Sequence, residues 1–118
     1  MKKIYLLSND DDFLRLIQLV LRKKYELKSN KDIANIRNDL KEFMPDLILI
    51  DHFPGIKDSQ KTISRIILSN EVKTVPFIFF SGSLEEEKLN NKLGAAGYIT
   101  KPSTSEEISN YVDAFWGC

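Results

Sequence analysis

The chain has little cysteine or histidine and no excess of charge of either sign. Of its 118 residues, one is a cysteine, Cys118, and one is a histidine, His52. A single thiol excludes an internal disulfide and these two residues alone do not make a metal cluster, which favours a reducing compartment. Lys and Arg total 17, as do Asp and Glu, so no net field favours nucleic acid or an anionic membrane as a partner.

Long hydrophobic runs are also missing. The N-terminal stretch MKKIYLLSNDDD has two lysines and then four apolar residues before the acids. That run is too short for a signal peptide or a membrane span, so we expect a cytoplasmic protein. The length is that of one ordinary domain, and we expect a single domain over residues 1–118.

Short apolar runs alternate with longer segments of helical period along the whole chain. The apolar runs predict five strands, within 3–7, 25–29, 46–51, 75–83 and 97–102. The segments between and after them predict five helices, at about 13–24, 32–43, 59–67, 84–94 and 103–115. This alternation predicts an α/β fold in three layers, a doubly wound five-stranded parallel sheet with five flanking helices.

The ends and the buried side of two helices can be predicted from the same patterns. In the first helix, spacings of three and four predict a buried stripe of Phe13, Leu16, Ile17, Val20 and Leu21. In the second helix, we expect Asp32 as the N-cap and Pro45 as the stop.

Polar side chains follow three of the predicted strands. Asp51 follows the third strand, Ser81 the fourth and Lys101 the fifth. Ligands of doubly wound sheets bind beyond the carboxyl ends of the strands, where these residues gather. The set suits phosphoryl transfer to a carboxylate, with Asp51 as nucleophile and with Lys101 and Ser81 contacting phosphoryl oxygens. Mg²⁺, held by oxygen ligands, would complete the charge neutralisation.

Four stretches of this chain carry a family resemblance: KKIYLL with the acids after it, PDLILID, VPFIFFSGS and GAAGYITKPSTSEEI. Through them the chain resembles, over essentially its whole length, the receiver domains of bacterial two-component response regulators. The resemblance implies a flavodoxin-like strand order 2-1-3-4-5. It also implies a signalling domain rather than an enzyme, with slow autodephosphorylation as its only catalytic property.

The resemblance also implies roles for residues and partners. A sensor histidine kinase or a phosphotransfer protein would phosphorylate Asp51 with Mg²⁺ bound, and Lys101 would be the family's lysine. Ser81 would be the switch hydroxyl and Tyr98 the switch aromatic. A downstream protein would bind the face made by the fourth helix, fifth strand and fifth helix, with no role for nucleic acid or membrane.

The acidic segment after the first strand departs from the family pattern, which has two adjacent acids there. The predicted stripe of the first helix places Ser8 and Asn9 at these positions, with Asp10 one step beyond. An alternative register pairs Asn9 with Asp10, but it buries Ser8, exposes Leu16 and turns Gln18 toward the core. A buried amide without a partner costs on the order of 1 to 3 kcal/mol, so periodicity favours the first register.

The metal ligands therefore depend on the register. In the alternative register the candidate ligands are Asn9, Asp10 and Asp51. In the first register both family carboxylates are missing, and the chain becomes a pseudo-receiver, an interaction module that is not phosphorylated. Asp11 and Asp12 are in either case favourable charges at a helix N-terminus.

Two enzyme hypotheses fit the residues less well. A phosphohydrolase with an aspartyl nucleophile would need a carboxylate two residues after Asp51, where Phe53 stands. A flavin protein would need a small-residue phosphate loop after the first strand, and this loop is acidic.

The loop after the third predicted strand is shorter than is usual in receivers. Two residues, His52 and Phe53, separate Asp51 from Pro54, where receivers usually have three, so we expect this loop to be reshaped.

Overall fold

A computed structural model describes residues 1–8, 10–30, 35–51, 65–66, 69, 75–81, 97–100 and 104–116. Its strands are β1 (Lys3–Leu7), β2 (Glu26–Ser29), β3 (Leu47–Ile50), β4 (Phe77–Ser81) and β5 (Gly97–Thr100). Its helices are α1 (Asp11–Leu21), α2 (Ile36–Phe43) and α5 (Ser105–Phe115). Within these ranges, no helix is long and apolar enough to cross a membrane.

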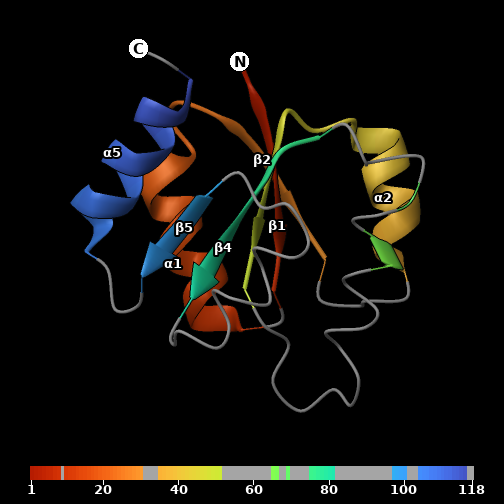
Figure 1. Cartoon of the computed structure of the whole chain (residues 1–118), viewed down its shortest axis with the longest axis horizontal. Helices are drawn as coiled ribbons and strands as arrows, with labels where there is room; N and C mark the ends of the chain where they lie inside the picture. The colour runs from red at the N-terminus through yellow and green to blue at the C-terminus, as the bar shows by residue number, and fades with distance from the viewer. Residues whose placement is uncertain are drawn as a thin grey trace.

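The five strands form one parallel sheet in the order β2-β1-β3-β4-β5. This order confirms the predicted doubly wound fold. Helices α1 and α5 cover one face of the sheet and α2 lies on the other (Figure 1). The helices predicted at 59–67 and 84–94 lie outside the described residues, apart from helical Arg65 and Ile66.

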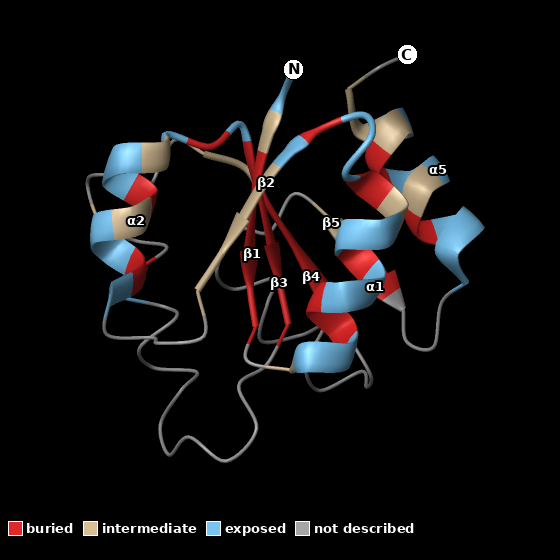
Figure 2. Cartoon of the chain, turned by 180° about the vertical axis from the view of Figure 1, so that it is seen from behind, coloured by how far each residue is buried: buried red, intermediate tan, exposed pale blue. Residues whose placement is uncertain are grey.

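The two faces of the sheet each bury their own apolar cluster. In β1, Ile4 and Leu6 face α1 and α5, whereas Tyr5 and Leu7 face the side of α2. All four residues of β3 are buried (Figure 2). A strand covered on both faces reads as a continuous apolar run, which is why LILI shows no polar alternation.

The buried side of α1 differs from the prediction at Leu14, Leu16 and Val20. Phe13, Leu14, Ile17 and Leu21 are buried, whereas Leu16 is 38% exposed and Val20 is half-buried. The predicted burial of Leu16 was therefore wrong. Apolar residues occupy two adjacent flanks of this helix, so spacing alone does not say which flank meets the sheet. Leu14 takes the inward place, and Leu16 turns toward α5.

The starts of α2 and α5 differ in how they are capped. Helix α2 begins at Ile36, and Asn35 before it makes no side-chain capping hydrogen bond. The predicted cap at Asp32 lies outside the described residues. At the start of α5, Thr104 Oγ1 accepts from the backbone N–H of Glu107 at 3.1 Å, as its Ser/Thr cap predicted.

Tyr111 of α5 packs directly on Gly97 of β5. A Cβ atom at position 97 would collide with the Tyr111 hydroxyl oxygen. Glycine at this position is therefore what lets the aromatic ring of α5 lie against the last strand.

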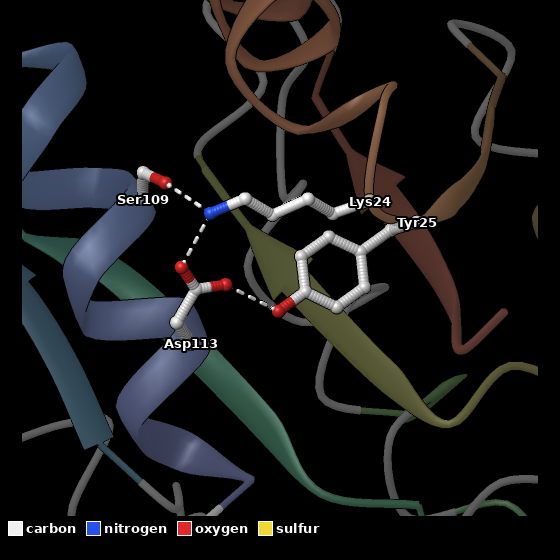
Figure 3. Close-up of polar contacts among 4 residues, drawn as sticks. All are labelled: Lys24, Tyr25, Ser109 and Asp113. Atoms are coloured by element: carbon white, nitrogen blue, oxygen red, sulfur yellow. Dashed lines mark hydrogen bonds and ion pairs between the residues drawn. The ribbon is translucent and has the colours of Figure 1, made fainter. Parts of the chain in front are cut away.

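A polar cluster joins the end of α1 to α5, and we call it the α1–α5 clamp: Lys24, Tyr25, Ser109 and Asp113 (Figure 3). Lys24 Nζ lies 2.7 Å from Asp113 Oδ2 and 3.4 Å from Ser109 Oγ. The Tyr25 hydroxyl donates to Asp113 Oδ1 at 2.6 Å. The hydrogen bond from Lys24, followed by that from Tyr25, lowers the pKa of Asp113.

A second tyrosine–aspartate pair anchors α2 on the opposite face. The hydroxyl of fully buried Tyr5 donates to Asp39 Oδ2 at 2.9 Å, and Asn30 Nδ2 donates to the same oxygen. Burial, together with the Asp39 carboxylate, raises the pKa of Tyr5. On each face of the sheet, a tyrosine hydroxyl therefore donates a hydrogen bond to an aspartate of a helix, Tyr5 to Asp39 of α2 and Tyr25 to Asp113 of α5.

Candidate functional site

The carboxyl ends of the two central strands place two polar residues side by side. In the sheet register Leu7 of β1 is opposite Ile50 of β3, so Ser8 and Asp51 come next on adjacent strands. Ile50 in turn pairs with Phe79 of β4. Since all strands are parallel, the residues that follow them meet at a single edge, which is the ligand-binding edge of this fold.

Ser8 and Asp51 contact each other inside the protein. Ser8 is fully buried and Asp51 is 2% exposed. The Ser8 hydroxyl donates to Asp51 Oδ2 at 3.4 Å, a long hydrogen bond. The backbone N–H of Asp51 donates to the Leu7 carbonyl at 2.9 Å, which continues the ladder between β1 and β3 one residue past the strands. Asp51 is thus a carboxylate held below the surface at the middle of the sheet edge.

Asp10 uses its side chain to begin α1. Its Oδ1 accepts from the backbone N–H groups of Asp12 at 2.9 Å and Phe13 at 3.3 Å, which makes it the N-cap. Its own backbone N–H donates to Ser8 Oγ at 3.1 Å. The Ser8 oxygen therefore accepts from the helix start while its hydrogen is donated to Asp51, so one hydroxyl links α1 to the buried carboxylate.

The structure combines features of both registers of the acidic segment. Ser8 is buried and Leu16 is exposed, as the alternative register required, but Gln18 is exposed, as the first register required. Burying the Ser8 hydroxyl does not leave it unsatisfied, because it bonds to both Asp10 and Asp51. The penalty that counted against the alternative register was for a buried Gln18 amide, and it does not arise because Gln18 is exposed.

The other predicted site residues are described only in part. Ser81 is the last residue of β4 and is paired with Thr100, and Tyr98 lies inside β5 opposite Phe79. The backbone of Ser81 thus reaches the same edge as Asp51, whereas that of Tyr98 is level with Ile50, and the side chains of Ser81 and Tyr98 are not described. Lys101 and Asn9 lie outside the described residues, as do His52 and Phe53 of the loop that we expect to be reshaped.

The described donors do not by themselves make a magnesium site. They comprise the Asp51 carboxylate and the Ser8 hydroxyl, because the Asp10 carboxylate is turned toward the backbone of α1. In the described part of the chain, no three His, Cys, Asp or Glu side chains gather as metal ligands. Magnesium is usually held by one or two carboxylates together with water and phosphate. The set of Asn9, Asp10 and Asp51 stays a prediction.

Comparisons with known proteins agree with this architecture. No protein-family model matches the chain. The chemotaxis protein CheY of Halobacterium salinarum is 32% identical over 123 residues, covering 97% of this chain and all of that protein. The structure of Vibrio cholerae chemotaxis protein CheY4 superimposes with a TM-score of 0.82 at 16% identity, covering 97% of this chain and 98% of that one.

A third neighbour carries a metal. The receiver domain of a sensor histidine kinase from Pseudomonas aeruginosa has magnesium coordinated in its active site cleft. It superimposes with a TM-score of 0.79 at 19% identity, covering 99% of this chain and 98% of that one. The fold, the buried aspartate after β3 and the identity with the archaeal CheY agree, and the chain belongs to the CheY-like receiver domains of two-component response regulators.

Proposed function

We propose that Asp51 accepts a phosphoryl group and that this modification switches a protein-interaction surface. The observation that supports the proposal is the buried carboxylate of Asp51 at the carboxyl edge of the central strands. An Asp51 oxygen would attack the phosphorus of a phosphohistidine on a sensor kinase or phosphotransfer protein. The P–O bond to Asp51 forms as the P–N bond breaks, and the donor histidine keeps the electron pair.

The remaining roles are those that the resemblance to receiver domains implies. Lys101 would pair with a phosphoryl oxygen and Ser81 would donate to another, with Tyr98 of β5 occupying the space that Ser81 leaves. The output surface would comprise β5, α5 and the helix predicted at 84–94, where a downstream protein binds. Water attack on the acyl phosphate would return Asp51 slowly to its resting state.

Magnesium has a conditional place in this proposal. If Asn9 presents its side-chain oxygen beside Asp51, then Asn9, Asp10 and Asp51 would hold the ion, which would neutralise charge on the phosphoryl group. The Asp10 carboxylate would have to leave the N–H groups of Asp12 and Phe13 or use its second oxygen. Loss of an N-cap costs roughly 0.5 to 2 kcal/mol, so such a site would be weaker than one with two uncommitted acids.

The second candidate function is a pseudo-receiver, and the geometry at Ser8 favours it specifically. In the described part of the chain, the Ser8 hydroxyl lies against Asp51, and the Asp10 carboxylate is engaged as the N-cap of α1. Without a metal, little except Lys101 would offset the charge of a phosphoryl group that approaches the buried carboxylate. The chain would then bind its partner in a single state.

Phosphorylation with a small-molecule donor separates the two functions. The protein is incubated with acetyl phosphate and Mg²⁺, and intact mass spectrometry detects one added phosphoryl group. Asp51→Asn is the matched control, and Ser8→Asp/Asn9→Asp restores the family's acidic pair. Addition to the wild type that is absent from Asp51→Asn supports the switch, whereas addition to the restored variant alone identifies the pseudo-receiver.

Magnesium affinity provides a second measurement of the same question. Titration of Mg²⁺ against the Trp116 fluorescence compares the wild type with Ser8→Asp/Asn9→Asp. Equal affinity in both proteins would contradict the pseudo-receiver, because the wild-type segment would then hold the ion as well as a paired-acid segment does. Circular dichroism confirms that each variant is folded.

A further inference from the structure

Helix α1 exposes two leucines beside α5. Leu16 is 38% exposed and Leu19 is 60% exposed. With Val20 of α1 and Ser105, Glu106 and Ser109 of α5 they line an open groove of about 460 Å³, which we call the α1–α5 groove. The two helices lie side by side in both views of the fold (Figures 1 and 2). The clamp of Lys24 with Asp113 holds them together at one end.

Opposite charges flank this leucine pair along α1. Asp12 lies one turn before Leu16 and Lys23 lies one turn after Leu19, and both are exposed. Residues four apart share a face of a helix. Arg22 keeps a right-handed helical backbone (φ −60°, ψ −25°), so the turn continues as far as Lys23. Along this face of α1 the order is therefore Asp12, Leu16, Leu19 and Lys23, and we call these four residues the strip.

The strip is self-complementary under a two-fold rotation. Leu16 and Leu19 have their midpoint between residues 17 and 18, and Asp12 and Lys23 have the same midpoint. A two-fold axis through that point, perpendicular to α1, places Leu16 of one copy on Leu19 of the other. The same axis places each Asp12 opposite the Lys23 of the second copy. An isologous dimer requires this arrangement, in which one patch meets itself.

We propose that the α1–α5 groove is the contact of a homodimer in which two α1 helices pack antiparallel. The choice of a second copy over another protein rests on the shared midpoint of the apolar and charged pairs. Two leucines per subunit with two symmetric ion pairs make a small interface, so the dimer is weak and depends on protein concentration. The proposal does not depend on phosphorylation of Asp51.

Sedimentation velocity over a range of concentrations tests the dimer. The protein carries Cys118→Ser, so that a disulfide between chains cannot be mistaken for it. Leu19→Glu places a charge at the centre of the contact and is expected to leave a monomer at every concentration. Met44→Glu is the matched control, because Met44 is 74% exposed at the end of α2, on the opposite face of the sheet, and should leave the dissociation constant unchanged.

Charge exchange tests the orientation of the two copies. Asp12→Lys and Lys23→Asp should each weaken the dimer by on the order of tenfold, and the double variant should recover most of the wild-type affinity. A wild type that stays monomeric at all concentrations overturns the proposal and leaves the groove to another protein. A dimer that tolerates Leu19→Glu, or a double variant no tighter than the single ones, overturns it as well.

Discussion

The two ends of the sheet each have an aspartate, and the two differ in burial and in hydrogen-bond partners. At the carboxyl end Asp51 is 2% exposed and lies 3.4 Å from the Ser8 hydroxyl. At the other end Asp113 has a side chain 34% exposed, and it contacts Lys24 at 2.7 Å and Tyr25 at 2.6 Å. One acid is buried beside a weak donor, and the other is accessible to water beside two strong ones.

This contrast separates a carboxylate that holds the fold together from one that is available for chemistry. Hydrogen bonds from a cation and a phenol stabilise the ionised form of Asp113 and tie α5 to the end of α1. Burial of the Asp51 carboxylate costs desolvation free energy, and functional sites commonly sacrifice stability in this way. Helix α1 runs between the two ends, because Asp10 begins it beside Ser8 and Lys24 follows its last turn.

The largest expected change in stability comes from the buried side of α1, the helix that runs between the two ends of the sheet. Leu14 is 6% exposed in the core under α1, whereas Leu16 faces the groove. Leu14→Ala should lower the free energy of unfolding by about 2 to 5 kcal/mol. Leu16→Ala should lower it by less, about 1 kcal/mol, because Leu16 is already 38% exposed and lies at the open groove and not in the core. Urea unfolding measures both free energies. Equal losses would contradict the difference in burial between Leu14 and Leu16.

The next largest change in stability is expected from substitution of the two aspartates, Asp113 and Asp51. Asp113→Ala removes both bonds of the clamp to α5, and we expect a loss of about 1 to 2 kcal/mol in unfolding free energy. Asp51→Asn keeps the shape and an acceptor for Ser8 while removing a buried charge. It should leave stability unchanged or raise it by up to about 1 kcal/mol. A loss at Asp51→Asn as large as that at Asp113→Ala would remove the distinction between the two ends.

The smallest effect is a pH dependence carried by Asp113. Its folded-state pKa is lowered from the ordinary value of 3.8, so the unfolded chain binds the proton more readily. The stabilisation is therefore fully present above about pH 4 and is lost as the pH falls through the folded-state pKa.

Thermal unfolding measured at pH 5 and at about pH 3 tests that sign. The wild type should lose more stability between the two values than Asp113→Asn does. Glu106→Gln, a change at an exposed acid on the same helix, is the control and should follow the wild type. A steeper loss in Asp113→Asn would mean that Asp113 is not held ionised by the clamp.

The strands and the doubly wound sheet could be predicted because the apolar runs are continuous and alternate with helical segments. The strand order came from the resemblance to receiver domains. The stripe of α1 could not be predicted, since Leu14, Leu16, Leu19 and Val20 supply apolar residues on more than one flank. The clamp could not be predicted either, because Lys24 and Asp113 are 89 residues apart and no local pattern relates them.

The candidate site was predicted in its placement more than in its contacts. Asp51 lies where the end of its apolar run put it, at the edge of the sheet. The bonds of Ser8 to Asp10 and Asp51 had no signal in the sequence, because a serine after a strand equally suits a turn. Whether the Ser8 hydroxyl reaches both partners depends on how α1 lies on the sheet, and that is a property of the folded chain.

The position of β2 at the edge of the sheet also bears on aggregation. An exposed edge offers unpaired backbone groups to any strand that approaches, and charged side chains are a common defence. Here Glu26 and Lys28 supply the charges, and each lies near a partner of opposite sign, Lys3 at 4.0 Å and Asp39 at 3.9 Å. A second chain that tried to extend the sheet past β2 would have to desolvate both pairs, which disfavours fibre-like growth at that border.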